Sequence, residues 1–195
     1  AREGARVVVC DIGASLQGAG TDAGPAGSVV AEIKQLGGEA IASTLSIIEP
    51  KNADEIVRAA LEAFGRVDIL VNNAGITRDT LLLRMKEEDF DAVLQTNLRG
   101  VYLCTKSALR PMTKARGGRI INISSTNAGR MPFAGGAVYA MSKSALTGLA
   151  KGMARDLGSR GITVNNVQPG PIDTDMNPAT GDFATALHGL MALPR

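Results

Sequence analysis

The chain has 195 residues, of which 45% are hydrophobic and 21% charged, and its 21 Lys and Arg residues nearly balance 19 Asp and Glu residues. This composition excludes an intrinsically disordered chain, which would be poorer in apolar residues and more highly charged, and it excludes collagen, which needs glycine at every third position. The sequence also has no run of about 18 apolar residues, the length that a membrane span requires. We expect a single domain over residues 1–195, because this length suffices to bury one core.

The balanced charge and the scarcity of aromatic residues argue against a nucleic-acid-binding protein. With no Trp, two Tyr and four Phe, the chain offers no platform of stacking rings. Cys10 and Cys104 lie in apolar runs without the spacing of metal ligands, so they are interpreted as small buried side chains in a reducing compartment. We therefore expect a cytoplasmic protein with no metal site, no nucleic-acid partner and no membrane partner.

Short runs rich in Val and Ile alternate along the chain with longer stretches in which apolar residues recur at helical spacing. This alternation is typical of βαβ units and predicts an α/β fold, a doubly wound parallel sheet covered on both faces. In chain order, the expected strands cover residues 7–10, 40–45, 67–71, 119–123 and 162–167. The expected helices cover residues 25–36, 51–64, 87–114 and 136–157.

Residues 13–27, between the first expected strand and the first expected helix, are rich in Gly and Ala and predict a surface loop. Gly13, Gly18 and Gly20 do not have the G-x-G-x-x-G spacing, and no expected helix begins at the last of them. We therefore do not expect this loop to bind phosphate.

Polar residues follow the first and third expected strands, at the sheet edge where ligands of parallel sheets bind. The carboxylate of Asp11 could accept both hydroxyls of an adenosine ribose, and it would repel the extra phosphate of NADP. The alternative for Asp11 is a strand-ending residue that caps a turn. In Asn72-Asn73-Ala74-Gly75, the amides could tie neighbouring strand ends together, and the small residues would let a flat ligand approach, although a turn without a ligand is the alternative.

Tyr139 and Lys143 are four residues apart in a predicted helix and therefore share one helical face. A phenol has a pKa near ~10, and a nearby cation favours the phenolate, which would make Tyr139 a candidate acid or base. The hydroxyl of Ser125, after the strand 119–123, would stand at the same sheet edge. The alternative is a solvated Lys beside a half-buried Tyr, since an isolated Y-x-x-x-K pattern often occurs by chance.

Taken together, these motifs resemble the short-chain dehydrogenase/reductase family over the whole chain. The resemblance is carried by NNAG at 72–75, TN at 96–97, NISS at 122–125, YAMSK at 139–143 and PG at 169–170. It implies a Rossmann-like fold and an NAD(P)-dependent oxidoreductase that interconverts a secondary alcohol and a ketone. In its middle, the chain is most similar to bacterial 3-oxoacyl-acyl-carrier-protein reductases. That similarity implies an acyl thioester as a substrate class, an acyl carrier protein as a candidate partner, and a homo-oligomer, either a dimer or a tetramer.

The resemblance also implies roles for individual residues. Tyr139 would be the proton donor or acceptor, and Lys143 would lower its pKa and hold the nicotinamide ribose. Ser125 would polarise the carbonyl, and Asn97 would complete a water relay. The expected cofactor-binding residues are Asp11, Asn73, Ala74, Gly75, Tyr139, Lys143, Pro169, Gly170, Ile172 and Thr174. Asp11 favours NAD, whereas the carrier-protein reductases of the family usually prefer NADP, so NADP stays a possible cofactor.

The chain departs from the family at both ends. Nothing before Arg2 supplies the family's first strand and the TGxxxGxG turn that holds the pyrophosphate, and the family's last strand is also lacking. The first strand lies centrally in the family's strand order, so we expect its absence to separate a pair of strands from the others and to leave unpaired edges. The sequence is therefore expected to belong to a longer protein of roughly 240 to 260 residues. The alternative function is a non-catalytic fragment or assembly module that cannot hold the dinucleotide.

Overall fold

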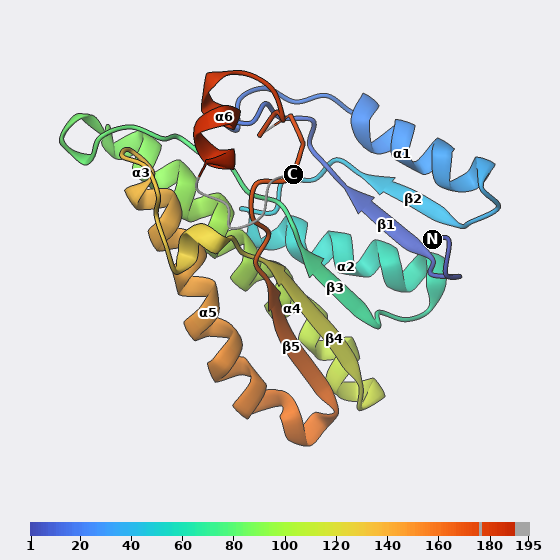
Figure 1. The fold of residues 1–195 in the computed structure, drawn as a ribbon. Coiled ribbons are helices and arrows are strands. Elements are labelled where there is room, and N and C mark those ends of the chain that lie inside the picture. Colours follow the sequence, from blue (N-terminus) through green and yellow to red (C-terminus); the bar gives the residue numbers. More distant parts are fainter. Residues whose placement is uncertain (176, 190–195) are drawn as a thin grey trace.

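The computed structural model describes residues 1–175 and 177–189, in which strands and helices alternate as the sequence predicts (Figure 1). The strands are β1 (Val7–Cys10), β2 (Ala40–Ser43), β3 (Ile69–Asn72), β4 (Gly118–Ile123) and β5 (Ile162–Val167). The helices are α1 (Gly24–Gln35), α2 (Pro50–Phe64), α3 (Glu87–Leu94), α4 (Val101–Ala115), α5 (Ala137–Leu157) and α6 (Asp182–His188). Shorter helical turns are η1 (Leu82–Arg84), η2 (Gln95–Gly100), η3 (Thr126–Ala128) and η4 (Gly158–Arg160).

The predicted single helix over residues 87–114 is wrong in one respect, because η2 interrupts it with a π-helical turn between α3 and α4. A π-helical turn widens the backbone spiral by one residue, and such turns are frequent at functional sites. The reason is tertiary, because the side chain of Asn97, within η2, bonds to the backbone of Ile76 on another segment. Hydrophobic periodicity carries no information about that contact.

All strand pairs are parallel, so the carboxyl ends of the strands share one edge of the molecule, where α6 also lies (Figure 1). In the described part of the chain the strands form two sheets, β1-β2 and β3-β4-β5. The expected separation of the first two strands from the others is therefore confirmed. The space between the two sheets belongs to a large cavity of about 1760 Å³, and residues of β1, β3, α2 and α4 line it.

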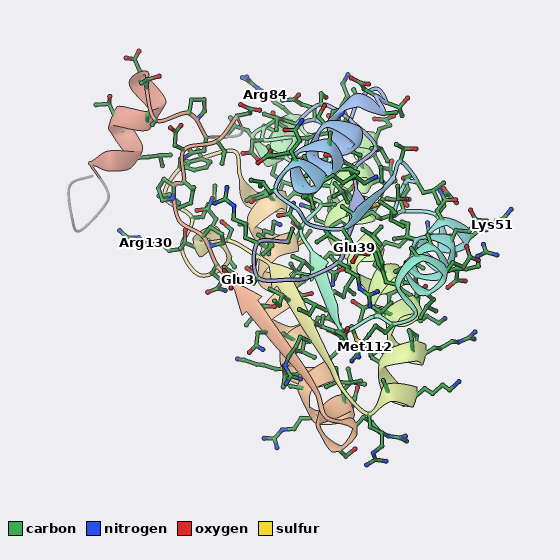
Figure 2. The ribbon with its side chains drawn as sticks, turned by 90° about the vertical axis from the view of Figure 1, so that its right-hand side faces the viewer. Glu3, Glu39, Lys51, Arg84, Met112 and Arg130 are labelled. Carbon is green, nitrogen blue, oxygen red and sulfur yellow. The ribbon has the colours of Figure 1, made fainter. Side chains whose placement is uncertain are left out.

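The helices α4 and α5 pack against the three-stranded sheet and form the main apolar core. Its buried members are Ala108, Met112, Ile120, Ala150, Ile162 and Val164. The helix α2 contacts both β1 and α4. Its Ala53 packs against Leu103 and Cys104 of α4, so α2 joins the two sheets across their gap. Figure 2 shows α6 standing away from the main body, on the side where Arg130 lies. Among the described helices, none has the length and apolar character needed to cross a membrane.

The core between α4, α5 and the sheet makes a direct stability prediction. Ile120 of β4 is 0% exposed, so Ile120→Ala removes apolar contacts and leaves a cavity. We expect the free energy of unfolding to fall by about 2–5 kcal/mol, measured by chemical denaturation. Leu83→Ala is the control, because Leu83 is 98% exposed and its loss should change the free energy by no more than about 0.5 kcal/mol. Equal effects of the two changes would contradict this placement of the core.

Candidate functional site

The large cavity reaches the carboxyl edge of both sheets, and there it collects the residues that the sequence singled out. The predicted site residues that line it are Asp11, Asn73, Ala74, Gly75, Ser125, Tyr139, Lys143, Pro169, Gly170, Ile172 and Thr174. Asn97 is the exception, because it is fully buried behind the cavity wall. The structure thus brings residues that follow β1, β3, β4 and β5 to one place with residues of α5.

A ladder of three asparagines ties the strand ends of the larger sheet together. Asn72, Asn122 and Asn166 are direct register partners on β3, β4 and β5. Asn72 Nδ2 donates to Asn122 Oδ1 over 2.9 Å, and Asn122 Nδ2 donates to Asn166 Oδ1 over 3.0 Å. The first amide also donates to Thr105 Oγ1 of α4 over 3.1 Å. Because buried amides are costly unless they are bonded, the ladder favours one register and so fixes where each strand presents its next residue.

Asn97 supports the site from behind. Its Oδ1 accepts from Ile76 N over 2.9 Å, and its Nδ2 donates to Ile76 O and to Ser142 Oγ, each over 3.0 Å. The hydroxyl of Ser142 in turn donates to the backbone oxygen of Tyr139 over 2.7 Å. Both amide hydrogens of Asn97 are therefore used by the protein, whereas its oxygen keeps one free lone pair. The water relay through Asn97 stays a prediction. In the structure, the Asn97 side chain holds the backbone of Ile76 and, through Ser142, the first turn of α5 near Tyr139.

Tyr139 and Lys143 lie on the same face of α5, as their spacing predicts. Lys143 Nζ is 5.7 Å from the centroid of the Tyr139 ring and donates to the backbone oxygen of Ile123, at the end of β4, over 2.8 Å. Gly75 faces the same amine, because a Cβ atom at Gly75 would come within 3.3 Å of Lys143 Nζ and of Asn97 Oδ1. A side chain at position 75 would therefore crowd the amine, and glycine keeps this part of the cavity open.

The two groups differ in their electrostatics. Burial raises the pKa of Tyr139, a hydrogen bond with Ser125 lowers it, and the charge of Asp79 raises it, with a net upward shift. Burial lowers the pKa of Lys143 to about 8. The expectation that Lys143 makes Tyr139 more acidic is therefore not met in this structure, because desolvation of the phenol is the largest effect. The phenol is instead held protonated at neutral pH, within hydrogen-bond reach of Ser125.

Asp11 has the turn-capping role that was its alternative interpretation, and its contact with a ribose stays a prediction. Its Oδ1 accepts from the backbone N–H of Gly13 over 2.7 Å, which is the turn-capping role. The side chain is exposed at the cavity edge, so its second carboxylate oxygen is available to a ligand. No group of three or more His, Cys, Asp and Glu residues that could hold a metal ion occurs within residues 1–175 and 177–189.

Comparison with known proteins decides the family. Residues 1–184 match the model of the short chain dehydrogenase family. The chain belongs to this family. The chain is 52% identical over 151 residues to a 3-oxoacyl-[acyl-carrier-protein] reductase of Synechocystis sp., an alignment that covers 77% of this chain and 61% of that protein. The chain thus spans about three fifths of the length of the curated relatives that it matches.

Solved structures agree with this assignment. A short-chain dehydrogenase/reductase from Serratia marcescens is 47% identical, with a TM-score of 0.90 over 99% of this chain and 75% of that chain. A short chain dehydrogenase from Burkholderia cenocepacia, in complex with NADP, is 42% identical, with a TM-score of 0.89 over the same shares. The predicted Rossmann-like α/β fold of this chain is therefore confirmed.

Several contributors to the site were not singled out from the sequence. Ser124 Oγ donates to the backbone oxygen of Lys143 over 2.8 Å, and Ser142 joins Asn97 to Tyr139. Ser124 lies inside the NISS motif and Ser142 inside the YAMSK motif, so their membership of these motifs is the sequence signal that could have identified them. Asp79 influences Tyr139 although no local pattern marks it, because the two lie on different segments that only the fold brings together.

The lowered pKa of Lys143 predicts a pH effect on stability. Between about 8 and its ordinary 10.5, the folded chain has lost a proton that the unfolded chain still binds, so the free energy of unfolding rises with pH. Burial raises the pKa values of Cys10 and Cys104, which acts in the opposite direction over this range, so the effect of Lys143 is taken as the difference between wild type and Lys143→Met. We expect this difference in the free energy of unfolding to rise by roughly 1 to 2 kcal/mol in favour of wild type from pH 8 to about 9.5. Urea denaturation at both pH values measures this difference. The exposed Lys151→Met is the control and should behave as wild type does, and a difference between wild type and Lys143→Met that does not change with pH would refute the assignment.

Proposed function

We propose that this protein is an NAD(P)-dependent oxidoreductase that interconverts a secondary alcohol and a ketone, with 3-oxoacyl thioesters as its substrate class. The observation that carries the proposal is the meeting of Ser125, Tyr139 and Lys143 on the wall of one cavity, beside Gly75. The reductase of Synechocystis sp. supports the substrate class, and the NADP complex of the Burkholderia cenocepacia enzyme supports the cofactor class.

The described residues suit the two ends of a dinucleotide. The open backbone at Gly75 and the amine of Lys143 suit the nicotinamide end, and the exposed carboxylate of Asp11 suits the adenosine ribose. A bound nicotinamide would supply the hydride. Cofactor binding is accordingly proposed through Asp11, Tyr139 and Lys143 together with the remaining expected contacts, which are Asn73, Ala74, Gly75, Pro169, Gly170, Ile172 and Thr174.

Two hydroxyl groups would receive the substrate carbonyl. Ser125 and Tyr139 lie within hydrogen-bond reach of each other, so one oxygen atom placed between them could accept from both. Because the pKa of Tyr139 is raised, its phenol carries a proton throughout the neutral range. A protonated donor suits the reductive direction, in which the carbonyl oxygen gains a proton as negative charge develops on it. Lys143 would place a positive charge beside this donor.

Partners and assembly remain predictions. An acyl carrier protein is a candidate partner, and we take Arg116 and Arg160 as its candidate contacts. Arg116 ends α4 and Arg160 ends η4, and both residues are exposed. They lead into β4 and β5, so they lie at the sheet edge opposite to Tyr139. A carrier that docked there would have to extend its thioester around the sheet. A homo-oligomer is expected on the family resemblance, and a cytoplasmic location on the two cysteines without metal-ligand spacing.

Removing the phenolic hydroxyl tests the proposed chemistry. Tyr139→Phe should lower kcat at least about 100-fold, because it deletes the proton donor, while NADH binding stays measurable. Oxidation of NADH with a panel of ketones and 3-oxoacyl thioesters measures turnover and identifies the substrate. The chain offers a matched control, since its other tyrosine, Tyr102, is 51% exposed on α4 and Tyr102→Phe should retain activity. Turnover that persists in Tyr139→Phe would count against the assignment.

Asp11 predicts the choice between NAD and NADP. Asp11→Ser keeps a turn-capping oxygen but removes the charge that would repel the 2′-phosphate. We expect the ratio of kcat/KM for NADPH to that for NADH to rise at least about tenfold, measured with both cofactors on one ketone. The exposed Asp156→Ser of α5 is the control. An unchanged ratio would mean that Asp11 does not contact the ribose.

One observation favours the alternative of a non-catalytic fragment or assembly module. Within the described residues, β1 and β3 face a shared cavity without being paired with each other. Titration of the 195-residue chain with NADH, followed by fluorescence, separates the two functions. Binding by this chain supports the oxidoreductase. If NADH binds only to a version with further residues before Ala1, the 195-residue chain is the non-catalytic fragment or assembly module.

A further inference from the structure

The glycine-rich segment 12–22 is a compact loop with its own hydrogen bonds. At its base, Asp22 N donates to Ile12 O over 2.8 Å, so the two ends of the loop lie together. At its tip, Ser15 N donates to Ala19 O and Gly18 N donates to Ser15 O, each over 2.8 Å. A loop with closed ends and internal bonds moves as a unit, and such loops are frequently functional.

The tip of this loop is fastened to the segment after β3. Arg78 Nε donates to Gln17 O over 2.9 Å, and the same guanidinium pairs with Asp89 of α3 over 2.7 Å. The Arg78 and Asp89 side chains are 26% and 32% exposed, so this pair is partly shielded from solvent. A guanidinium can serve both acceptors because its N–H groups form a fixed fork. Arg78 therefore fastens the loop tip to α3.

The surface that receives the tip is held rigidly. Gly18 has a φ of +80°, and a Cβ atom there would come within 3.1 Å of the Ile76 Cδ1 atom, so the tip lies directly on Ile76. Ile76 is 8% exposed, and the side chain of Asn97 binds both its backbone N–H and its oxygen. The loop thus rests on a fixed anchor, and only its own few contacts need to break for it to lift.

The fastened loop crosses the edge of the cavity that the proposed function gives to the dinucleotide. It begins next to Asp11, and its residues line the same cavity as Gly75 and Thr77 on the other side. Figure 1 shows the segment between β1 and α1 running from the β1-β2 side across the carboxyl edge toward α6. A dinucleotide that reaches from Asp11 to Gly75 would therefore have to pass this loop.

We propose that Arg78 is a positioning residue that holds loop 12–22 over the dinucleotide site through its bond to Gln17 O, a contact that we call the clasp. Opening of the clasp would control the entry and release of the dinucleotide. The inference rests on the proposed function, because it assumes that the cavity takes a dinucleotide. Arg78 acts through the loop and needs no contact with the substrate. Its loss should change dinucleotide binding kinetics and leave the KM for the ketone unchanged.

Arg78→Ala tests the clasp with two readouts. Amide hydrogen exchange in residues 13–20 and the dissociation of bound NADH, followed by a stopped-flow chase, should both become about tenfold faster, the effect of losing one hydrogen bond from a charged donor. Arg58→Ala is the matched control, because Arg58 pairs with Glu55 on the exposed face of α2 and should alter neither rate. Gly18→Ala should reproduce the phenotype without touching the Arg78–Asp89 pair, since a Cβ there strains the tip against Ile76.

The outcomes separate the inference from the proposed function. Faster exchange in 13–20 with faster NADH release in both variants, and an unchanged KM for the ketone, supports the clasp. Unchanged exchange in Arg78→Ala overturns it, and so does faster exchange with unchanged NADH release while wild type binds NADH. Failure of wild type to bind NADH would overturn the proposed function, and with it the gating role of the loop, whatever the exchange rates show.

Discussion

The burial of the Lys143 amine is the constraint on which the site depends. An ammonium group that is removed from water costs free energy unless the protein supplies partners, and Lys143 is only 5% exposed. The amine of Lys143 donates to Ile123 O, and Ser124 Oγ donates to the backbone oxygen of Lys143. These two bonds come from the end of β4 and its next residue. The position of α5 over the sheet is thereby fixed, and Tyr139, one turn earlier, is directed into the cavity.

Much of this arrangement could be predicted from the sequence, because it depends on local spacing. The β4 and β5 strands were predicted to within one residue, since alternating apolar residues and flanking glycines mark their limits. The shared face of Tyr139 and Lys143 follows from a spacing of four residues on a helix. Strand-tying amides were predicted at Asn72 and Asn73, and the structure shows the bond at Asn72; its partner Asn122 lies on a strand whose register only the folded sheet defines.

The features that the sequence did not reveal all depend on contacts between distant segments. The π-helical turn arises because Asn97 bonds to Ile76, 21 residues away. The upward pKa shift of Tyr139 arises from burial and from Asp79 on another loop. The tip of loop 12–22 is bonded to a distant segment, because Arg78 donates to Gln17 O and Thr77 N donates to Leu16 O. The composition of this segment predicted a loop but not its contacts. Gly and Ala have small side chains, so their pattern in the sequence does not show which residues the loop packs against.

The unjoined strand edges have a consequence for the chain in solution. On β3, Ile69 and Val71 are 54% and 51% exposed, beside backbone groups that pair with no strand in the described residues. An open edge with apolar side chains is a template for strand addition from a neighbouring molecule. A strand from elsewhere in the same protein or from a neighbouring molecule could therefore pair with this edge and cover both side chains.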